Sequence, residues 1–189
     1  FEVRERYVLW LLQPIFDPRG KISHRITRAR PFRTLRYANF VEVTCPLFRA
    51  DKLDAFLQQY DPSLIGWGVD WWFCESLGPE IQRRVAIVDA ITSLNPHDAT
   101  KSGRREIDQL QDVPGRMQSW QRIKQIYNLN YDEQDQTVFA TVPAPWTPRT
   151  IAQSLKLAAC GLARAAKKPA RFYRKRLAPR LFGACAPGT

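Results

Sequence analysis

Hydrophobic residues along the chain follow the two-residue period of strands in several places. Residues 7–12, YVLWLL, predict a buried strand that ends before Pro14. Apolar and polar residues alternate over residues 39–46, NFVEVTCP, which predicts a second strand. Residues 83–90 hold a continuous apolar run typical of a central strand, and residues 136–143 predict a late strand.

Helical periodicity and turn residues fill the intervals between these strands. Residues 50–61 predict a helix whose apolar side chains recur at the spacing of one buried face: Leu53, Phe56, Leu57 and Tyr60. Two further helices are predicted near residues 104–111 and 118–129, and a loop or irregular edge over the basic stretch that ends at about Arg36. Alternating strands and helices indicate an α/β domain.

Length and charge divide the chain into a body and a tail. A chain of 189 residues, 44% of them hydrophobic, can bury one substantial core, which we assign to residues 1–150. Of the 29 Lys and Arg residues, nine follow Thr150, and none of the 18 Asp and Glu residues does. The body is therefore nearly neutral, whereas residues 151–189 form a polycationic segment.

The tail predicts a binding surface for anionic partners. Ile151, Leu155 and Leu162, with alanines between them, indicate an amphipathic helix, and the later basic residues are interleaved with aromatic ones. This composition suits an anionic membrane surface and, less well, nucleic acid. A solvated terminus without a partner is the alternative.

The stretch GWGVDWWF, residues 66–73, holds the main candidate for chemistry. Asp70 follows two glycines that permit a tight bend, and it opens a predicted short helix. Trp67 and Trp71 offer flat apolar surfaces of the kind that hold a sugar ring, and a carboxylate beside them can accept a proton from a hydroxyl group. The alternative is that Asp70 caps the helix by accepting from the amide of Phe73 or a neighbour, with the tryptophans in the core.

Two further residues are candidates for the same site. Asp89 ends the central strand, a common position for ligand-binding residues in α/β folds. His97 follows in a loop beside Asp98, which makes a divalent metal site conceivable. The four cysteines have no zinc-site spacing, which favours free thiols in a reducing, cytoplasmic compartment. No apolar run approaches the length of about 20 residues that spans a bilayer, which indicates a soluble protein or the soluble part of one.

Three segments in order, FVEVTCPLF, GWGVD and VAIVDAI, resemble an uncharacterised bacterial and plant family with a GT-A glycosyltransferase-like fold. The similarity covers about residues 35–97, and the preceding LLQPIFDPRGKISHRIT also fits loosely. The resemblance implies a Rossmann-like mixed sheet flanked by helices. It also implies transfer of a sugar from a nucleotide sugar to a glycan acceptor.

The resemblance assigns a role to each candidate residue. Asp70 would contact the acceptor, as base in an inverting transfer, and Gly66, Trp67, Gly68 and Trp71 would shape the acceptor pocket. Asp89 would close the central strand beside it. The family histidine position holds Asn95 here, so that His97, two residues later, would approach an Mn or Mg ion.

The chain has no D-x-D sequence, the element with which GT-A enzymes hold the metal and the sugar nucleotide. We therefore expect this chain to be the acceptor-side, C-terminal portion of such a domain, in the cytoplasm or at the inner face of the membrane. The alternatives are a non-catalytic glycan-binding module and a basic protein that binds membrane or nucleic acid. The donor, the acceptor and the stereochemical outcome are not defined by the sequence.

Overall fold

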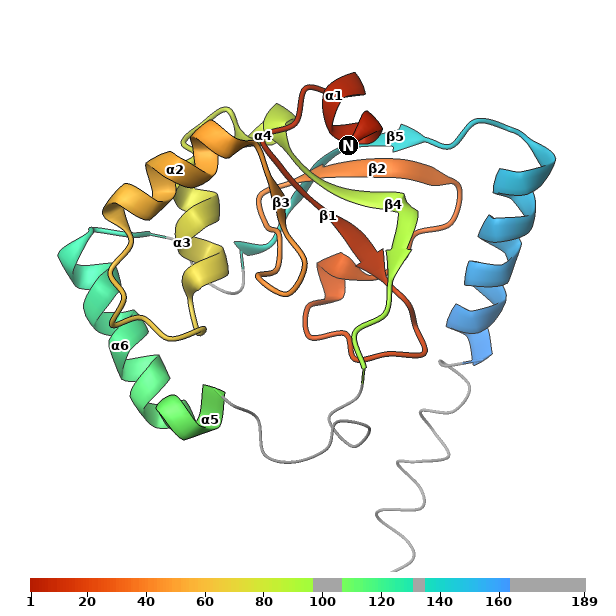
Figure 1. Ribbon diagram of the computed structural model, residues 1–189. Helices are drawn as coiled ribbons and strands as arrows, with labels where there is room; N and C mark the ends of the chain where they lie inside the picture. Colours follow the sequence, from red (N-terminus) through yellow and green to blue (C-terminus); the bar gives the residue numbers. More distant parts are fainter. Residues whose placement is uncertain (97–106, 131–134, 164–189) are drawn as a thin grey trace, which may run out of the picture.

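The computed structural model describes residues 1–96, 107–130 and 135–163, and within these ranges it is a mixed α/β structure built on one five-stranded sheet (Figure 1). The strands are β1 (Leu11–Phe16), β2 (Arg33–Ala38), β3 (Leu47–Phe48), β4 (Val85–Ser93) and β5 (Val138–Pro143). Their order in the sheet is β3-β1-β4-β2-β5. The central β1 and β4 are parallel, and the other neighbouring pairs are antiparallel.

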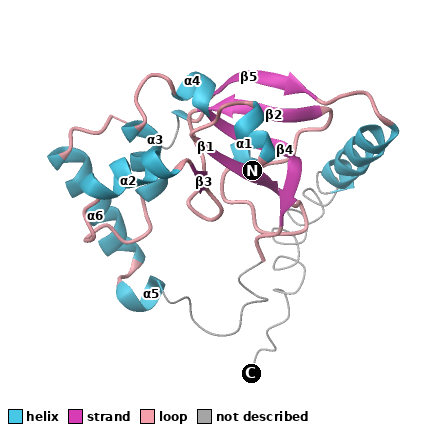
Figure 2. Ribbon diagram, turned by 45° about the horizontal axis from the view of Figure 1, so that its top comes forward, coloured by secondary structure: helices cyan, strands magenta, loops and turns pink. Residues whose placement is uncertain are grey.

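Helices flank this sheet. They are α1 (Glu2–Arg6), the 3-10 helix η1 (Arg25–Thr27), α2 (Ala50–Gln59), α3 (Val69–Ser76), α4 (Ile81–Arg84), α5 (Ile107–Leu110), α6 (Val113–Ile126) and an unlabelled helix at 148–163. In Figures 1 and 2, α2, α3 and α6 lie together on one side of the molecule, and helix 148–163 lies at the other. Within the described ranges, no helix has both the length and the apolar character that a membrane crossing requires.

The alternation of side chains along β4 divides the core between the two faces of the sheet. Val85 and Ile87 pack into a large cluster that contains the aromatic residues of α2 and α3, whereas Ala86 and Val88 face a smaller cluster with Leu9. All four β4 side chains are fully buried. The predictions of a central strand at 83–90 and of a late strand at 136–143 are confirmed.

The predicted strand at 39–46 is wrong. Beyond Ala38 the chain leaves the sheet, and residues 39–46 form no strand before the two-residue β3 at Leu47–Phe48. In place of a neighbouring strand, the Gln13 side chain and the Thr137 backbone form hydrogen bonds with this segment. The Asn39 N–H donates to the Thr137 carbonyl at 3.1 Å, the Asn39 side chain accepts from the Thr137 N–H at 2.7 Å, and the Glu42 N–H donates to the Gln13 side chain.

The first strand lies later in the sequence than predicted, and the second strand of the sheet was not predicted at all. β1 continues through Pro14, and its pairing with β4 shifts register between Pro14 and Ile15, where the missing N–H of proline is tolerated. β2 occupies part of the stretch expected to be a loop. Its Arg36 is buried and forms an ion pair with Asp89. Because basic residues are usually exposed, the sequence pattern did not indicate a strand inside the sheet here.

The predicted helix at 50–61 is confirmed as α2, but its buried face is narrower than the periodicity indicates. Phe56 is buried among aromatic rings, whereas Leu57 is 54% exposed. The expectation that Leu57 lies in the core is therefore wrong. Of this helix, Phe56 and the partly buried Tyr60 pack into the large core cluster that also contains Val85 and Ile87.

The later helices agree with the predictions in part. α5 covers the described end of the helix expected at 104–111, and α6 begins earlier than residue 118. Asp112 caps α6 by accepting from the Gly115 N–H at 2.8 Å, and Pro114 occupies its first turn. Helix 148–163 crosses the boundary drawn between residues 150 and 151. Its Ser154 is buried and accepts from the Phe32 N–H at 2.9 Å.

Candidate functional site

A turn with two left-handed glycines leads into α3 and positions the candidate residues. Gly66 and Gly68 have φ angles of 72° and 91°. A Cβ atom on Gly68 would lie 2.3 Å from the Trp120 ring, and one on Gly66 would lie 2.3 Å from the Ile107 side chain. Both positions thus combine a backbone conformation that favours glycine with a space that excludes a side chain. The turn sets Trp67 and the first residues of α3 against the same cavity.

Asp70 is not the N-cap of α3. The cap is Gly68, and Asp70 lies in the first turn, where Oδ1 accepts from the Trp71 N–H at 3.1 Å. Asp70 is only 6% exposed to solvent. Burial, and to a smaller extent the negative charge of Glu42, raise the pKa of Asp70 to about 7. The nearby backbone amides of Trp71 and Val43 act in the opposite direction.

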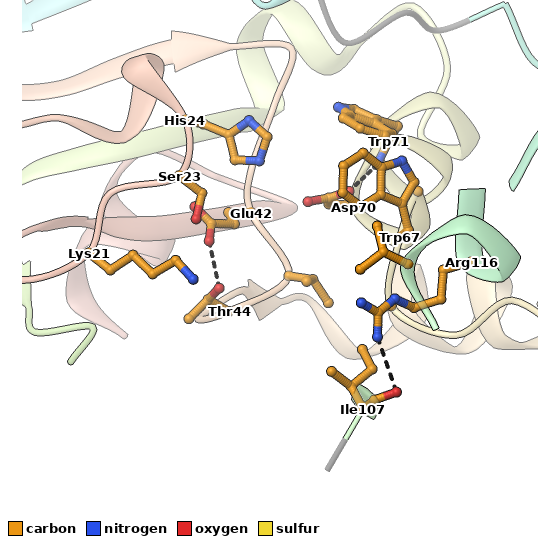
Figure 3. Close-up of a pocket in the computed structure, with 14 residues that line it drawn as sticks. Lys21, Ser23, His24, Glu42, Thr44, Trp67, Asp70, Trp71, Ile107 and Arg116 are labelled. Carbon is orange, nitrogen blue, oxygen red and sulfur yellow. Dashed lines mark hydrogen bonds between the residues drawn. The ribbon is translucent and has the colours of Figure 1, made fainter. Parts of the chain in front are cut away.

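Asp70 lines a pocket of about 380 Å³ that also contains the glycine turn (Figure 3). The lining residues are Lys21, Ser23, His24, Glu42, Val43, Thr44, Gly66, Trp67, Gly68, Asp70, Trp71, Ile107, Val113 and Arg116. Five residues predicted from the sequence are therefore brought together. Figure 3 shows Trp67 and Trp71 on the Asp70 side, with Lys21, His24 and Glu42 opposite.

Glu42 gives the pocket a second carboxylate, which the sequence analysis did not identify. It is 5% exposed, and its Oε1 accepts from the Thr44 hydroxyl at 2.7 Å. Its Oε2 is buried without a hydrogen-bond partner among the described residues. Glu42 lies where the chain leaves the sheet, close enough to Asp70 to influence its pKa.

His24 and Arg116 are further polar groups that the sequence alone did not place. The Gln136 amide nitrogen lies 2.8 Å from His24 Nδ1. Because that nitrogen only donates, Nδ1 accepts, and neutral His24 then holds its proton on Nε2. Arg116 is buried and donates to Asp108 at 2.9 Å and to the Ile107 and Gln111 carbonyls at 3.1 Å. We infer that Arg116 holds α5 against α6, whereas His24 contributes its ring to the wall of the cavity.

The structure does not bring Asp89 to this pocket. The Asp89 side chain is fully buried and accepts from Arg36 at 2.7 Å and 3.1 Å and from the Arg30 N–H at 2.7 Å. Burial raises the pKa of Asp89, and the Arg36 charge opposes that effect. Asp89 lines a separate pocket beside helix 148–163. The cleft that we expected Asp70 and Asp89 to share is not formed.

The metal prediction has no support from the described residues. His97 lies outside them, and the rest contain no group of three His, Cys, Asp or Glu side chains placed to hold a metal ion. Such a site needs several oxygen or nitrogen ligands converging on one point. The Mn or Mg ion therefore stays a prediction.

The arrangement can bind a polar ring and remove a proton from it. Aromatic rings, two buried carboxyl groups and a histidine lie around one cavity, and one carboxyl group has a pKa near neutrality. No family model, curated protein or solved structure matches this chain.

Proposed function

We propose that the pocket binds the acceptor sugar of a glycosyl transfer and that Asp70 is the general base. The observation that carries this proposal is the buried Asp70, with a pKa of about 7, beside Trp67 and Trp71 in a cavity. A base with a pKa near the working pH combines a usable ionised fraction with sufficient basicity. The aromatic rings supply an apolar surface for the flat side of a sugar.

In this proposal ionised Asp70 takes the proton of an acceptor hydroxyl group. The freed oxygen forms a bond to the anomeric carbon of a nucleotide sugar, and the bond from that carbon to the diphosphate breaks. Glu42, by its charge, keeps the proton affinity of Asp70 high enough for this step. His24 lines the same cavity. We assign no step to a metal ion, since the described residues contain no group of three potential ligands.

Within the mixed α/β class, we further propose that this chain is the acceptor-side portion of a GT-A domain. This assignment is supported by the parallel central pair β1 and β4 in a mixed sheet, and by the glycine turn that presents Asp70. The nucleotide sugar rests on the resemblance of the sequence segments. A glycan-binding module that uses the same pocket without transfer is the alternative.

The test measures transfer and binding on the same variants. Purified protein is incubated with a panel of nucleotide sugars and oligosaccharides, and nucleoside diphosphate release and glycan products are measured. Asp70→Asn should lower turnover by roughly 10²-fold or more, while the exposed α2 variant Asp54→Asn should leave it unchanged.

Binding to a glycan array separates the two functions. Trp67→Ala should weaken glycan binding, whereas Asp70→Asn should retain it. Glycan binding without transfer by the unaltered protein would favour the module. Binding and transfer unaffected by both substitutions would remove the function from this pocket.

A further inference from the structure

Helix 148–163 has an apolar side that no other described element covers. Leu155 and Leu162 are 58% and 73% exposed, and the intervening Ala159 is exposed with them. The spacing of three and four residues places these side chains on one stripe. Ser154 lies about a quarter turn away around the helix and is buried against the body through its hydrogen bond with Phe32. The helix is thus attached to the body through Ser154, and both leucines are exposed to solvent. It lies at the edge of the molecule, beyond the sheet (Figure 1).

An exposed tryptophan lies directly before this helix. Trp146 is 80% exposed, and its ring stacks on Phe32 with 5.8 Å between centroids and 25° between planes. Phe32 also donates its N–H to Ser154, so one residue holds both Trp146 and the helix. Tryptophan is enriched where proteins meet the headgroup layer of a membrane.

The charged residues of the helix and of the sequence that follows it are all basic. No Asp or Glu follows Asp135 in the sequence, whereas Arg149 and nine later residues are Lys or Arg. Of these, Arg149 and Lys156 are exposed on the helix itself. Basic residues beside an apolar stripe are the composition of helices that lie in the surface of anionic membranes.

We propose that helix 148–163 binds an anionic phospholipid surface, with Trp146, Leu155 and Leu162 inserted at the level of the headgroups. Nucleic acid is the weaker choice, because the exposed leucines would have no role in contacts with phosphates. A second copy of the chain is disfavoured, because pairing this face would bring two positive surfaces together. This proposal is independent of the function of the Asp70 pocket.

Co-sedimentation of the full chain with vesicles tests the proposal. The vesicles contain equal parts of phosphatidylglycerol and phosphatidylcholine, or phosphatidylcholine alone. We expect binding to the anionic vesicles only, and at least tenfold weaker binding for the double variant Leu155→Ser, Leu162→Ser. The matched control is Leu57→Ser, since Leu57 is 54% exposed on α2. Thermal unfolding shows that each variant is folded.

Three outcomes would overturn the proposal. The double variant could bind anionic vesicles as tightly as the unaltered protein, which would leave only charge as the cause. Light scattering could show a dimer that the double variant dissociates, which would assign the leucines to a second copy. The protein could bind a single-stranded oligonucleotide and not the vesicles, which would assign the basic face to nucleic acid.

Discussion

A carboxylate in the first turn of a helix is normally kept ionised by the amide groups around it, and Asp70 departs from that rule. Asp70 accepts a hydrogen bond from the Trp71 N–H, yet its pKa is about 7. The loss of contact with water and the negative charge of Glu42 raise the pKa by more than the backbone amides lower it. The same burial that suits Asp70 to the proposed role of base makes its ionised form unfavourable in the folded protein.

Asp70→Asn should therefore stabilise the protein by an amount that grows with pH. The folded protein binds the Asp70 proton more tightly than the unfolded chain, whose pKa is near 3.8. Stability contributed by this proton is fully present below pH 3.8 and is lost as the pH rises through about 7. A shift of about three units corresponds to about 4 kcal/mol at most.

Chemical denaturation of both proteins between pH 4 and pH 8 measures this difference. Asparagine has nearly the size of aspartate and does not titrate, so the advantage of the variant should be largest at pH 8. Asp54→Asn, on the exposed side of α2, is the matched control. An advantage of Asp70→Asn that stays constant across this range would mean that Asp70 is not buried with a raised pKa.

At the scale of elements, the glycine turn and α3 were predictable, because two glycines and an apolar run leave few local alternatives. Residues 39–46 were not predictable. Their alternating pattern indicated a strand, but hydrogen bonds to Thr137 and Gln13, both distant in sequence, direct the chain away from the sheet. Glu42 and His24 were missed for the same reason, since only tertiary contacts bring them to the pocket.

α2 offers a direct test of how narrow its buried face is. Phe56→Ala should lower the free energy of unfolding by about 3–5 kcal/mol, because it empties space among packed aromatic rings. Leu57→Ala should change it by less than about 0.5 kcal/mol, because the side chain is already largely in solvent. Urea denaturation of the two variants measures both values. Equal losses would mean that Leu57 is buried after all.

At the scale of the whole molecule, the sequence predicted the fold class and one side of the candidate pocket. Asp89 shows why the rest was not accessible. Its position at the end of the central strand indicated a ligand site, but β2 lies next to β4 and supplies Arg36, which neutralises it. Which strands are neighbours is a property of the assembled sheet, and local periodicity does not encode it.

The central claim, that Asp70 is a base tuned by Glu42, is tested most directly by the pH dependence of transfer. The ratio kcat/KM of the unaltered protein should rise with pH and reach half its maximum near pH 7, since only ionised Asp70 accepts the proton. Glu42→Gln removes a negative charge that raises the pKa of Asp70, so its profile should be displaced to lower pH. A flat profile between pH 5 and pH 8, or identical midpoints in the two proteins, would contradict the account.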